Sequence, residues 1–435
     1  MGTWIKDGQV VDPVKGLVEK LDIIVENGRI LKILPRGEFK EKDPKLRIID
    51  VSDKIISPGL IDMHVHLREP GHEYKETIAS GGKAGAIGGF TALTCMPNTE
   101  PVNDSGSVTE YILLQARKAN LVKVYPVAAI TKGQKGETLT DFGDLKTAGA
   151  FGVSDDGLPV SNSKVMRRAM EYANYHRLVV ISHCEDTNLS HGGVMHEGIV
   201  SAQLGLQGIP AASEEVMVYR DISLAKLTGC PVHIAHVSTK GSVELIRRAK
   251  EEGVHITAET APHYFTLDHH AVIGYNTNAK MNPPLRTWED VHAIKEGLTD
   301  GVLDVIATDH APHSPLEKDL EFDKAAYGII GLETALPLSL ALVRDGVLSL
   351  PEAIRKLSYN PASILGVEGG SILEGGPGDL VIIDPDLEFI LRKEDLHSKS
   401  NNSPFIGKSL KGRNMLTMIG GRIVWERDAE YFSSG

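Results

Sequence analysis

The stretch LIDMHVHLREPGHEYKE, residues 60–76, decides the fold because its character changes abruptly at its centre. It begins as an apolar run, LIDMHV, which is typical of a strand buried on both faces. His64 and His66 stand at the end of this run, and Arg68 follows two residues later. Alternate side chains of a strand point to the same side, so both imidazoles can reach one point. The stretch therefore predicts a buried strand whose carboxyl end carries functional side chains.

Seven further apolar runs follow the first along the chain. Segments between them, such as 165–176 and 242–253, carry apolar residues every three or four positions, as amphipathic helices do. Alternating strands and helices predict a (β/α)₈ barrel, with a doubly wound open sheet as the alternative because a strand count does not show closure. The eight expected strands are residues 60–65, 90–95, 122–129, 151–154, 178–182, 232–235, 254–259 and 304–309.

Both ends of the chain have a different character from the middle. They contain short β-like runs separated by Gly, Asp and Asn, and within residues 21–34 the letters ENG indicate a hairpin turn. We expect the two ends to pair into one small β-sandwich domain, built from 1–57 and 366–435. Residues 58–365 would then form the barrel.

Composition gives the broad class of the protein. The chain has 435 residues, of which 41% are hydrophobic and 24% charged, and its formal net charge is −12. This acidic balance argues against general binding to nucleic acid or anionic membranes. The opening residues lack a signal-peptide pattern, and no apolar run is long enough to span a bilayer. Three cysteines in or beside apolar runs fit reduced thiols, so we expect a cytoplasmic protein.

Polar residues recur where other expected strands end. In a (β/α)₈ barrel these ends meet at one mouth, where catalytic groups lie. A single buried histidine is more often structural, and His-x-His alone is a weak signal, but together these positions predict a site for Zn²⁺ or a similar ion. The ligands outnumber those of one tetrahedral ion, so two ions about 3.5–4 Å apart, sharing an oxygen ligand, are expected. The residues are Asp155, Asp156, His183, His236 and Asp309, with His310 and His313 beyond.

Several short motifs together carry a resemblance to a known family. They are DMHVHLREPGHEYKE (62–76), MPNT (96–99), SDDG (154–157), SHCED (182–186), AHVS (235–238), KMNPPLR (280–286), TDHAPH (308–313) and GLET (331–334). The chain resembles the amidohydrolase superfamily and, within it, the class I bacterial dihydroorotases, over essentially its whole length. HVH marks only the superfamily, whereas REPGHEYKE, MPNT and KMNPPLR in combination are far more specific.

The resemblance implies a role for each metal ligand. His64, His66 and Asp309 would hold one zinc ion, His183 and His236 the other, and Asp156 would bridge them. Many members of the superfamily use a carboxylated lysine on strand four as the bridge. The run FGVSDDG has no lysine, and a carboxylate bridge is typical of class I.

The implied reaction is the reversible closure of N-carbamoyl-L-aspartate to L-dihydroorotate and water, a step of pyrimidine synthesis. A metal lowers the pKa of bound water to about 7, and the other metal polarises the carbonyl. Asp309 would take a proton from the nucleophile and pass it to the leaving nitrogen.

The resemblance also implies the substrate contacts. Arg68 would clamp the substrate carboxylate with a bidentate fork, and the alternative for this arginine is a surface ion pair with Glu69. Asn98 and Asn282 would each, taken alone, be interpreted as turn residues. The remaining implied contacts are His66, Asn98, Asn282, His313 and the backbone near Tyr327 and Gly328.

The segment 313–328, HSPLEKDLEFDKAAYG, is charged and lacks clear periodicity. It is expected to be a loop over the mouth that excludes water as a lid, or else an ordinary surface loop. Relatives often carry Pro-Phe where this chain has Ala326-Tyr327, so the contact at Tyr327 follows less directly from the resemblance.

Other functions remain open from the sequence. A hydantoinase or allantoinase would keep the same barrel and metals. A non-catalytic dihydroorotase-like subunit supporting aspartate transcarbamoylase is a second alternative, although every ligand position is filled here. A metal-stabilised binding module would not need Arg68 and Asp309 around an open coordination position. The expected partners are a small-molecule substrate and further copies of the chain, with aspartate transcarbamoylase as a candidate.

Overall fold

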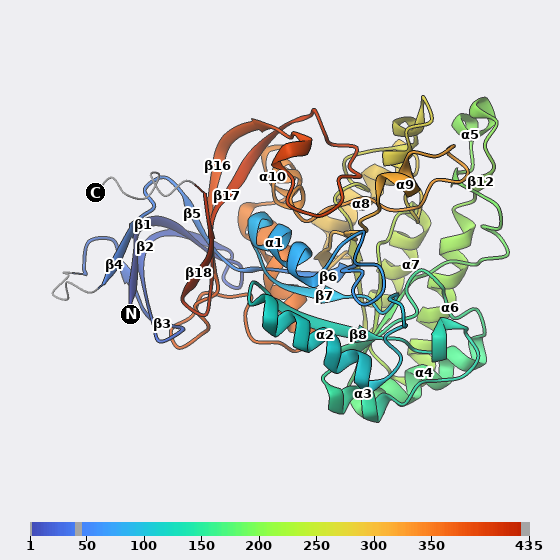
Figure 1. Cartoon of the computed structure of the whole chain (residues 1–435), viewed down its shortest axis with the longest axis horizontal. Helices are drawn as coiled ribbons and strands as arrows, with labels where there is room; N and C mark the ends of the chain where they lie inside the picture. The colour runs from blue at the N-terminus through green and yellow to red at the C-terminus, as the bar shows by residue number, and fades with distance from the viewer. Residues whose placement is uncertain (1, 40–45, 428–435) are drawn as a thin grey trace.

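The computed structural model describes residues 2–39 and 46–427 and has two parts, a small β-sheet and a larger barrel (Figure 1). All eight expected barrel strands are present, in the order β15-β14-β13-β10-β9-β8-β7-β6, with parallel neighbours. They are β6 (Leu60–Val65), β7 (Phe90–Cys95), β8 (Lys123–Ala128), β9 (Gly152–Val153), β10 (Val179–Ser182), β13 (Val232–Ile234), β14 (Ile256–Thr260) and β15 (Val305–Ile306).

The first and last strands of the barrel meet at its mouth. A parallel bridge joins Val65 to His310, and the amide of His66 donates to the carbonyl of His310 at 2.8 Å. Beside this bridge, Asp62 Oδ1 accepts from the amides of His64 and Thr308 at 3.1 Å each. The sheet therefore closes, and the alternative of an open doubly wound sheet is wrong. Closure brings the ligand candidates of the first and last strands together.

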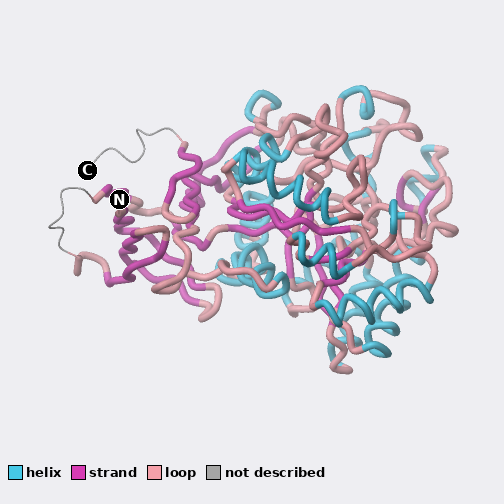
Figure 2. Tube along the Cα trace, turned by 60° about the horizontal axis from the view of Figure 1, so that its bottom comes forward, coloured by secondary structure: helices cyan, strands magenta, loops and turns pink. Residues whose placement is uncertain are grey.

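Helices surround the strands on the outside, as Figure 2 shows in cyan around magenta. In α4, the side chain of Asn162 caps the first turn, and buried residues recur at the spacing of one helical face, from Met166 to Ala173. The helices are α1 (Ile78–Gly88), α2 (Gly106–Ala119), α3 (Phe142–Ala148), α4 (Ser163–His176), α5 (Ile199–Leu204), α6 (Ala212–Thr228), α7 (Lys240–Glu251), α8 (Trp288–Thr299), α9 (Pro315–Lys318), α10 (Ala335–Arg344), α11 (Leu350–Ile354) and α12 (Asn360–Leu365).

Strands from both ends of the chain form one eight-stranded sheet, in the order β18-β17-β16-β5-β1-β2-β3, with β4 beside β1. The expected hairpin at ENG joins β2 to β3, and both Asn27 and Gly28 have positive φ, as such tight turns require. The strands are β1 (Thr3–Asp12), β2 (Leu17–Glu26), β3 (Arg29–Pro35), β4 (Arg47–Asp50), β5 (Ile55–Pro58), β16 (Leu380–Ile390), β17 (Ser409–Ile419) and β18 (Arg422–Glu426).

Both halves of this sheet share one apolar core, which is consistent with a sandwich. Ile5 and Ile56 from the first part of the chain pack with Ile382 and Met415 from the last part. The sheet is joined to the barrel helix α1 because Asn414 Nδ2 donates to the carbonyl of Ala86 at 3.1 Å. The predicted domain limits, 1–57 with 366–435 and 58–365, stay a prediction, and residues 1, 40–45 and 428–435 lie outside the described residues.

A protrusion follows β10, at the upper right in Figure 1. It contains α5 and a two-stranded parallel pair, β11 (Met195–His196) and β12 (Gly208–Ile209). All three cysteines are buried and free. Within the described ranges, no helix is both long enough and apolar enough to cross a membrane.

Candidate active site

The mouth of the barrel contains a cavity of about 370 Å³, and nearly all of the predicted site residues line it. His64 is completely buried and contacts the cavity's carboxylates from within the barrel. Asp155 and His310 also lie outside the wall: Asp155 Oδ1 accepts from the amide of Thr131, and His310 Nδ1 from the amide of Gly331, at 3.1 Å each. Gly157, Ala311 and Ala326 also contribute to the wall. The predicted residues in the wall are His66, Arg68, Asn98, Asp156, His183, His236, Asn282, Asp309, His313, Tyr327 and Gly328.

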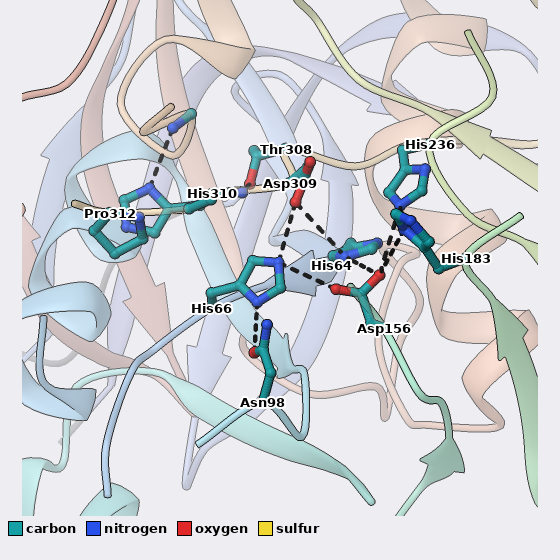
Figure 3. Close-up of polar contacts among 12 residues, drawn as sticks. His64, His66, Asn98, Asp156, His183, His236, Thr308, Asp309, His310 and Pro312 are labelled. Carbon is teal, nitrogen blue, oxygen red and sulfur yellow. Dashed lines mark hydrogen bonds and ion pairs between the residues drawn. The ribbon is translucent and has the colours of Figure 1, made fainter. Parts of the chain in front are cut away.

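Two groups of potential metal ligands lie side by side in this cavity and share Asp156 (Figure 3). One group adds His64 and His66, and the other adds His183 and His236. Within each group the ligand atoms lie within 4.8 Å of one another. The strands β6, β10 and β13 end at this point, which is why residues so far apart in the sequence meet here.

Each of three histidines uses its outer ring nitrogen for a hydrogen bond, and its inner ring nitrogen faces the cavity. His64 Nδ1 donates to Glu259 at 2.7 Å, and His66 Nδ1 donates to the amide oxygen of Asn98 at 2.8 Å. His183 Nε2 donates to Glu185 at 3.0 Å. In the neutral form that binds a metal, an imidazole carries one N–H, so each inner nitrogen would then present a lone pair to the cavity.

Two of these lone pairs face carboxylate oxygens, which cannot donate a hydrogen bond to them, and the third faces another imidazole. His64 Nε2 lies 3.3 Å from Asp156 Oδ1, and His66 Nε2 lies 3.2 Å from Asp309 Oδ1. His183 Nδ1 lies 2.7 Å from His236 Nε2. His64 Nε2 and Asp156 Oδ1 are buried and make no hydrogen bond. Imidazole nitrogens and carboxylate oxygens are the donors that zinc prefers, so this arrangement fits divalent cations.

The two cavity carboxylates are held in the ionised form. Burial opposes ionisation of Asp156, but the positive field of His64 and contacts with His183 and His236 hold the pKa of Asp156 well below its usual range. Burial also opposes ionisation of Asp309, and the contact with His66 holds its pKa below the usual value. Ionised Asp309 can therefore bind a cation or accept a proton.

Three residues of the site have backbone conformations that side chains rarely adopt. Arg68 has φ of 62°, His236 of 33° and Asp309 of 48°. Left-handed conformations of non-glycine residues cost on the order of 1–3 kcal/mol each and concentrate at functional sites. The turns after β6, β13 and β15 therefore direct these side chains at the expense of local stability.

Glu259 was not predicted as a functional residue. It lies on β14, is completely buried, and accepts from both His64 Nδ1 and His233 Nε2, the latter at 3.1 Å. His233 Nδ1 in turn lies 2.8 Å from the hydroxyl of Thr257. This chain of contacts fixes the orientation of His64. The only signal in the sequence is a glutamate in a run expected to be a buried strand.

Glu185 was also missed, although it belongs to the motif SHCED. Its carboxylate accepts from His183 Nε2 and from Asn282 Nδ2, at 3.0 and 2.9 Å. Burial opposes ionisation, but the hydrogen bond from His183 lowers the pKa of Glu185 to about 2. Glu185 therefore links a predicted ligand to a predicted substrate contact.

Arg68 provides a buried cation in the cavity wall. Its Nε donates to the carbonyl of Pro312 at 3.2 Å, and its Nη2 lies 3.3 Å from His313 Nε2. Within the described ranges no carboxylate oxygen lies within 4 Å of the guanidinium. Glu69 instead accepts from the amide of Ile78 at 2.9 Å, so the surface ion pair with Arg68 is not formed. Burial lowers the pKa of Arg68 to about 10, and the group is still cationic at neutral pH.

The segment 313–328 forms part of the cavity wall through His313, Ala326, Tyr327 and Gly328. The hydroxyl of Tyr327 donates to the carbonyl of Gly193 at 2.7 Å. The interpretation as an ordinary surface loop is therefore wrong, and movement as a lid stays a prediction.

Comparison with known proteins agrees with this geometry. A family model described as "Dihydro-orotase-like" matches residues 53–242, and one described as "Amidohydrolase family" matches residues 209–425. The solved structure of an L-hydantoinase from Arthrobacter aurescens superposes with a TM-score of 0.87 at 24% identity, covering 98% of this chain and 96% of that one. The structure of a dihydropyrimidinase from Brevibacillus agri superposes with a TM-score of 0.85 at 21% identity, covering 98% of this chain and 95% of that one. The fold and the site thus define a barrel hydrolase of the amidohydrolase superfamily.

Relatives with higher sequence identity show which family of this superfamily the chain belongs to. The dihydroorotase of Geobacter metallireducens is 54% identical over 427 residues, covering 98% of this chain and all of the relative. The dihydroorotase of Syntrophus aciditrophicus is 52% identical over 428 residues, with the same coverage. The chain belongs to the dihydroorotase family.

Proposed function

We propose that this chain is a class I dihydroorotase that interconverts N-carbamoyl-L-aspartate with L-dihydroorotate and water, in pyrimidine synthesis. The observation that carries the proposal is the pairing, in one cavity, of two histidine–carboxylate groups with the buried cation of Arg68. A cyclic amide that bears a carboxylate needs both features. The names of the relatives support the same reaction.

Two zinc ions per subunit are the cofactors in this proposal. His64, His66 and Asp309 would hold one ion, His183 and His236 the other, and Asp156 would be shared. The shared position of Asp156 between the two groups supports this division. When bound, such ions supply a water that ionises near neutral pH and a Lewis acid for the amide carbonyl.

Asp309 is the proton carrier in the reaction. Its ionised carboxylate lies in the cavity wall, 3.2 Å from His66 Nε2. In ring opening it takes the proton of the attacking water and gives it to the departing ring nitrogen. In ring closure it takes the proton from the attacking nitrogen and gives it to the departing hydroxide, which leaves as water. One carboxylate can serve both directions because it begins and ends each turnover ionised.

Arg68, Asn98 and Asn282 bind the substrate in this scheme. Arg68 forms charge-assisted hydrogen bonds with the substrate carboxylate. Because Asn98 Oδ1 accepts from His66, its amide N–H₂ is left to donate to the same carboxylate. Asn282 Nδ2 donates to Glu185, which leaves its oxygen to accept a ring N–H.

His66, His313 and the turn at Tyr327 and Gly328 complete the substrate site. The amide and carbonyl of Gly328 already bond to Lys280 and Lys318, at 3.0 and 3.1 Å. The backbone contact is therefore assigned to Tyr327. Assembly into homo-oligomers and association with aspartate transcarbamoylase remain predictions, and the free buried cysteines support a cytoplasmic location.

The decisive experiment compares substrates on zinc-supplemented protein whose metal content is measured in the same sample. We expect L-dihydroorotate to be opened to N-carbamoyl-L-aspartate, hydantoin and allantoin to be poor substrates, and chelation to abolish turnover. His64→Ala should lose both metal and turnover. Preference for a ring without a carboxylate would favour a hydantoinase-like activity. Absence of both metal and turnover in the unmodified protein would favour the non-catalytic subunit.

A further inference from the structure

Two buried lysines, Lys280 and Lys318, lie behind the wall of the cavity and have no part in the scheme above. Their residues are 1% and 3% exposed. Among the ion pairs of the described residues, neither lysine has a carboxylate partner within 4 Å. Lysine is almost never fully buried without a paired charge, so these two positions need an explanation.

Lys318 lies at the end of α9 and binds three backbone carbonyls. Its Nζ donates to Ala326 at 2.7 Å, to Gly328 at 3.1 Å and to Lys280 at 3.3 Å. An ammonium has three N–H donors, and all three are used. Two of the acceptors belong to the segment that lines the cavity.

Lys280 holds the same segment from the other side. Its Nζ donates to the carbonyls of Phe322 and Asp323, at 2.7 and 3.0 Å. It also lies 4.3 Å from the centre of the Tyr327 ring, within the range of a cation–π contact. The carbonyl of Lys280 accepts from the amide of Gly328 at 3.0 Å. The segment 314–328 is thus fastened at both ends to the residues before Asn282.

Burying the two ammonium groups costs free energy, and the location of the carbonyls that they bind suggests a reason for it. Burial lowers the pKa of Lys280 to about 8 and that of Lys318 to about 7, because each ammonium group loses its hydration there. A loop needed only for stability could be fastened with uncharged groups. Every carbonyl that the two ammonium groups bind lies in 314–328 or in Lys280 itself, next to the walls formed by Asn282 and Tyr327.

We propose that Lys280 and Lys318 are positioning residues, which hold segment 314–328 as a fixed wall of the cavity and so set the affinity for substrate. The proposal rests on the dihydroorotase function proposed above. Neither lysine contacts the histidines or carboxylates of the two ligand groups, so the chemical step should not depend on them directly.

The test uses Lys318→Met and Lys280→Met in the full-length, zinc-loaded protein. Methionine keeps the apolar length of the side chain and removes the donors. Lys324→Met is the matched control, because Lys324 lies in the same segment, is exposed, and pairs only with Glu321, at 3.5 Å. Hydrogen exchange of the amides in 314–328 is measured without substrate, and KM, kcat and metal content are measured with L-dihydroorotate.

We expect Lys318→Met to raise amide exchange in 314–328 at least about tenfold. KM should rise about tenfold, while kcat changes less than about threefold and metal content is unchanged. Lys280→Met should have the same pattern, and Lys324→Met should behave like the unmodified protein. Unchanged exchange and KM in either folded lysine variant, or a fall in kcat with KM constant, would overturn the proposal.

Failure of both variants to fold would also overturn it, since a wall that only sets affinity is not needed for folding. If only one variant folds, that variant decides. Absence of turnover in the unmodified protein would reject the dihydroorotase function, whereas the exchange measurement would still decide whether the lysines fasten the segment.

Discussion

Glu259 shows how a single carboxylate away from the cavity can control the site. It accepts from His64 Nδ1 and is itself held by His233, and all three side chains are completely buried. His64 is therefore fixed as one tautomer, with its free nitrogen directed at Asp156. Groups that orient metal-binding histidines in this way usually contribute strongly to metal affinity.

We predict that Glu259→Ala weakens zinc affinity about 10- to 100-fold, because His64 loses its orienting partner. Glu259→Gln should weaken it less, since the amide oxygen can still accept from His64. The affinities can be measured by competition with a chromogenic chelator, and the cobalt-substituted proteins should differ in their visible spectra. Thr257→Val, which alters only the outer end of the chain of contacts, serves as the control. Equal zinc affinity in Glu259→Ala and the unmodified protein would contradict the prediction.

Arg68 carries the second prediction at this scale. Arg68→Met should lower kcat/KM for L-dihydroorotate about 10- to 100-fold, because a hydrogen bond to a charged group contributes about 1.5–3 kcal/mol. Metal content should be unchanged, since the guanidinium contacts Pro312 and His313 rather than the predicted ligands. Arg68→Lys should recover part of the loss. Steady-state kinetics check this, and a kcat/KM within twofold of the unmodified value would exclude the carboxylate clamp.

The sequence predicted residues at strand ends well and residues behind them poorly. Of the twelve residues to which the resemblance assigns a role, eleven line the cavity. Alternation along a strand and the geometry of a barrel account for the histidines and aspartates at strand ends. The asparagines, His313, Tyr327 and Gly328 followed from the resemblance to the dihydroorotases. Glu259 and Lys318 carry no comparable pattern. A charged residue inside a strand or a charged segment is normally read as exposed, and only the fold shows that these two are buried.

At the scale of elements, the short helix α9 is anchored to the loop after β6. Glu317 in α9 accepts from Lys75 Nζ at 2.5 Å and from the amide and hydroxyl of Ser314, at 3.0 and 2.8 Å. Burial opposes ionisation, but Lys75 and Ser314 lower the pKa of Glu317 from 4.5 to about 2. This ion pair joins two loops that carry residues of the cavity wall, Arg68 and Tyr327.

The lowered pKa of Glu317 predicts how the free energy of unfolding changes with pH. The folded state binds a proton at Glu317 less readily than the unfolded state, so the ionised group stabilises the fold above about pH 4.5. This stabilisation is lost as the pH falls towards 2. Glu317→Gln should therefore lower the free energy of unfolding by on the order of 1 kcal/mol at pH 6, since the pair is partly exposed. The difference between the two proteins, measured by urea denaturation, should shrink below pH 4, and a constant difference from pH 6 to 2.5 would contradict this.

Element types were predictable where apolar patterns were long, and unpredictable where elements were short. The strand expected at 60–65 is found at those residues, and the helix expected within 165–176 begins only two residues earlier. The pair β11 and β12 has two residues in each strand, so it leaves no periodic pattern. The closure of the barrel was likewise not predictable by counting, because it depends on a single bridge between Val65 and His310.

At the scale of the whole molecule, one face of the composite sheet has an apolar core of its own, whereas residues on its other face, such as Val381 and Ile383, pack into the core of the barrel. Ile382 belongs to the core of the sheet, is completely buried, and lies on β16 far from the cavity residues in sequence. Its neighbours include Ile56, with which it is paired across the strands. Stability and catalysis should therefore respond to different substitutions.

We predict that Ile382→Ala lowers the free energy of unfolding by about 2–5 kcal/mol through the cavity it leaves, with kcat and KM unchanged at 25 °C. Ile390→Ala on the same strand is the control, because Ile390 is 54% exposed and its loss should cost less than about 0.5 kcal/mol. Denaturant titration and steady-state kinetics give both quantities. Equal destabilisation by the two substitutions would show that the shared core is not tightly packed.

The pairing of β5 with β16 also has a consequence for synthesis on the ribosome. Ile55 pairs with Ile383, so β5 is made long before the strand that covers its edge. At about 5–20 residues per second, translation needs on the order of tens of seconds to make the barrel in between. During this time a strand of apolar residues presents unpaired backbone groups, the kind of edge that recruits other chains. The nascent chain should therefore depend on chaperones most while its barrel is emerging, and a faster-folding barrel alone would not remove that exposure.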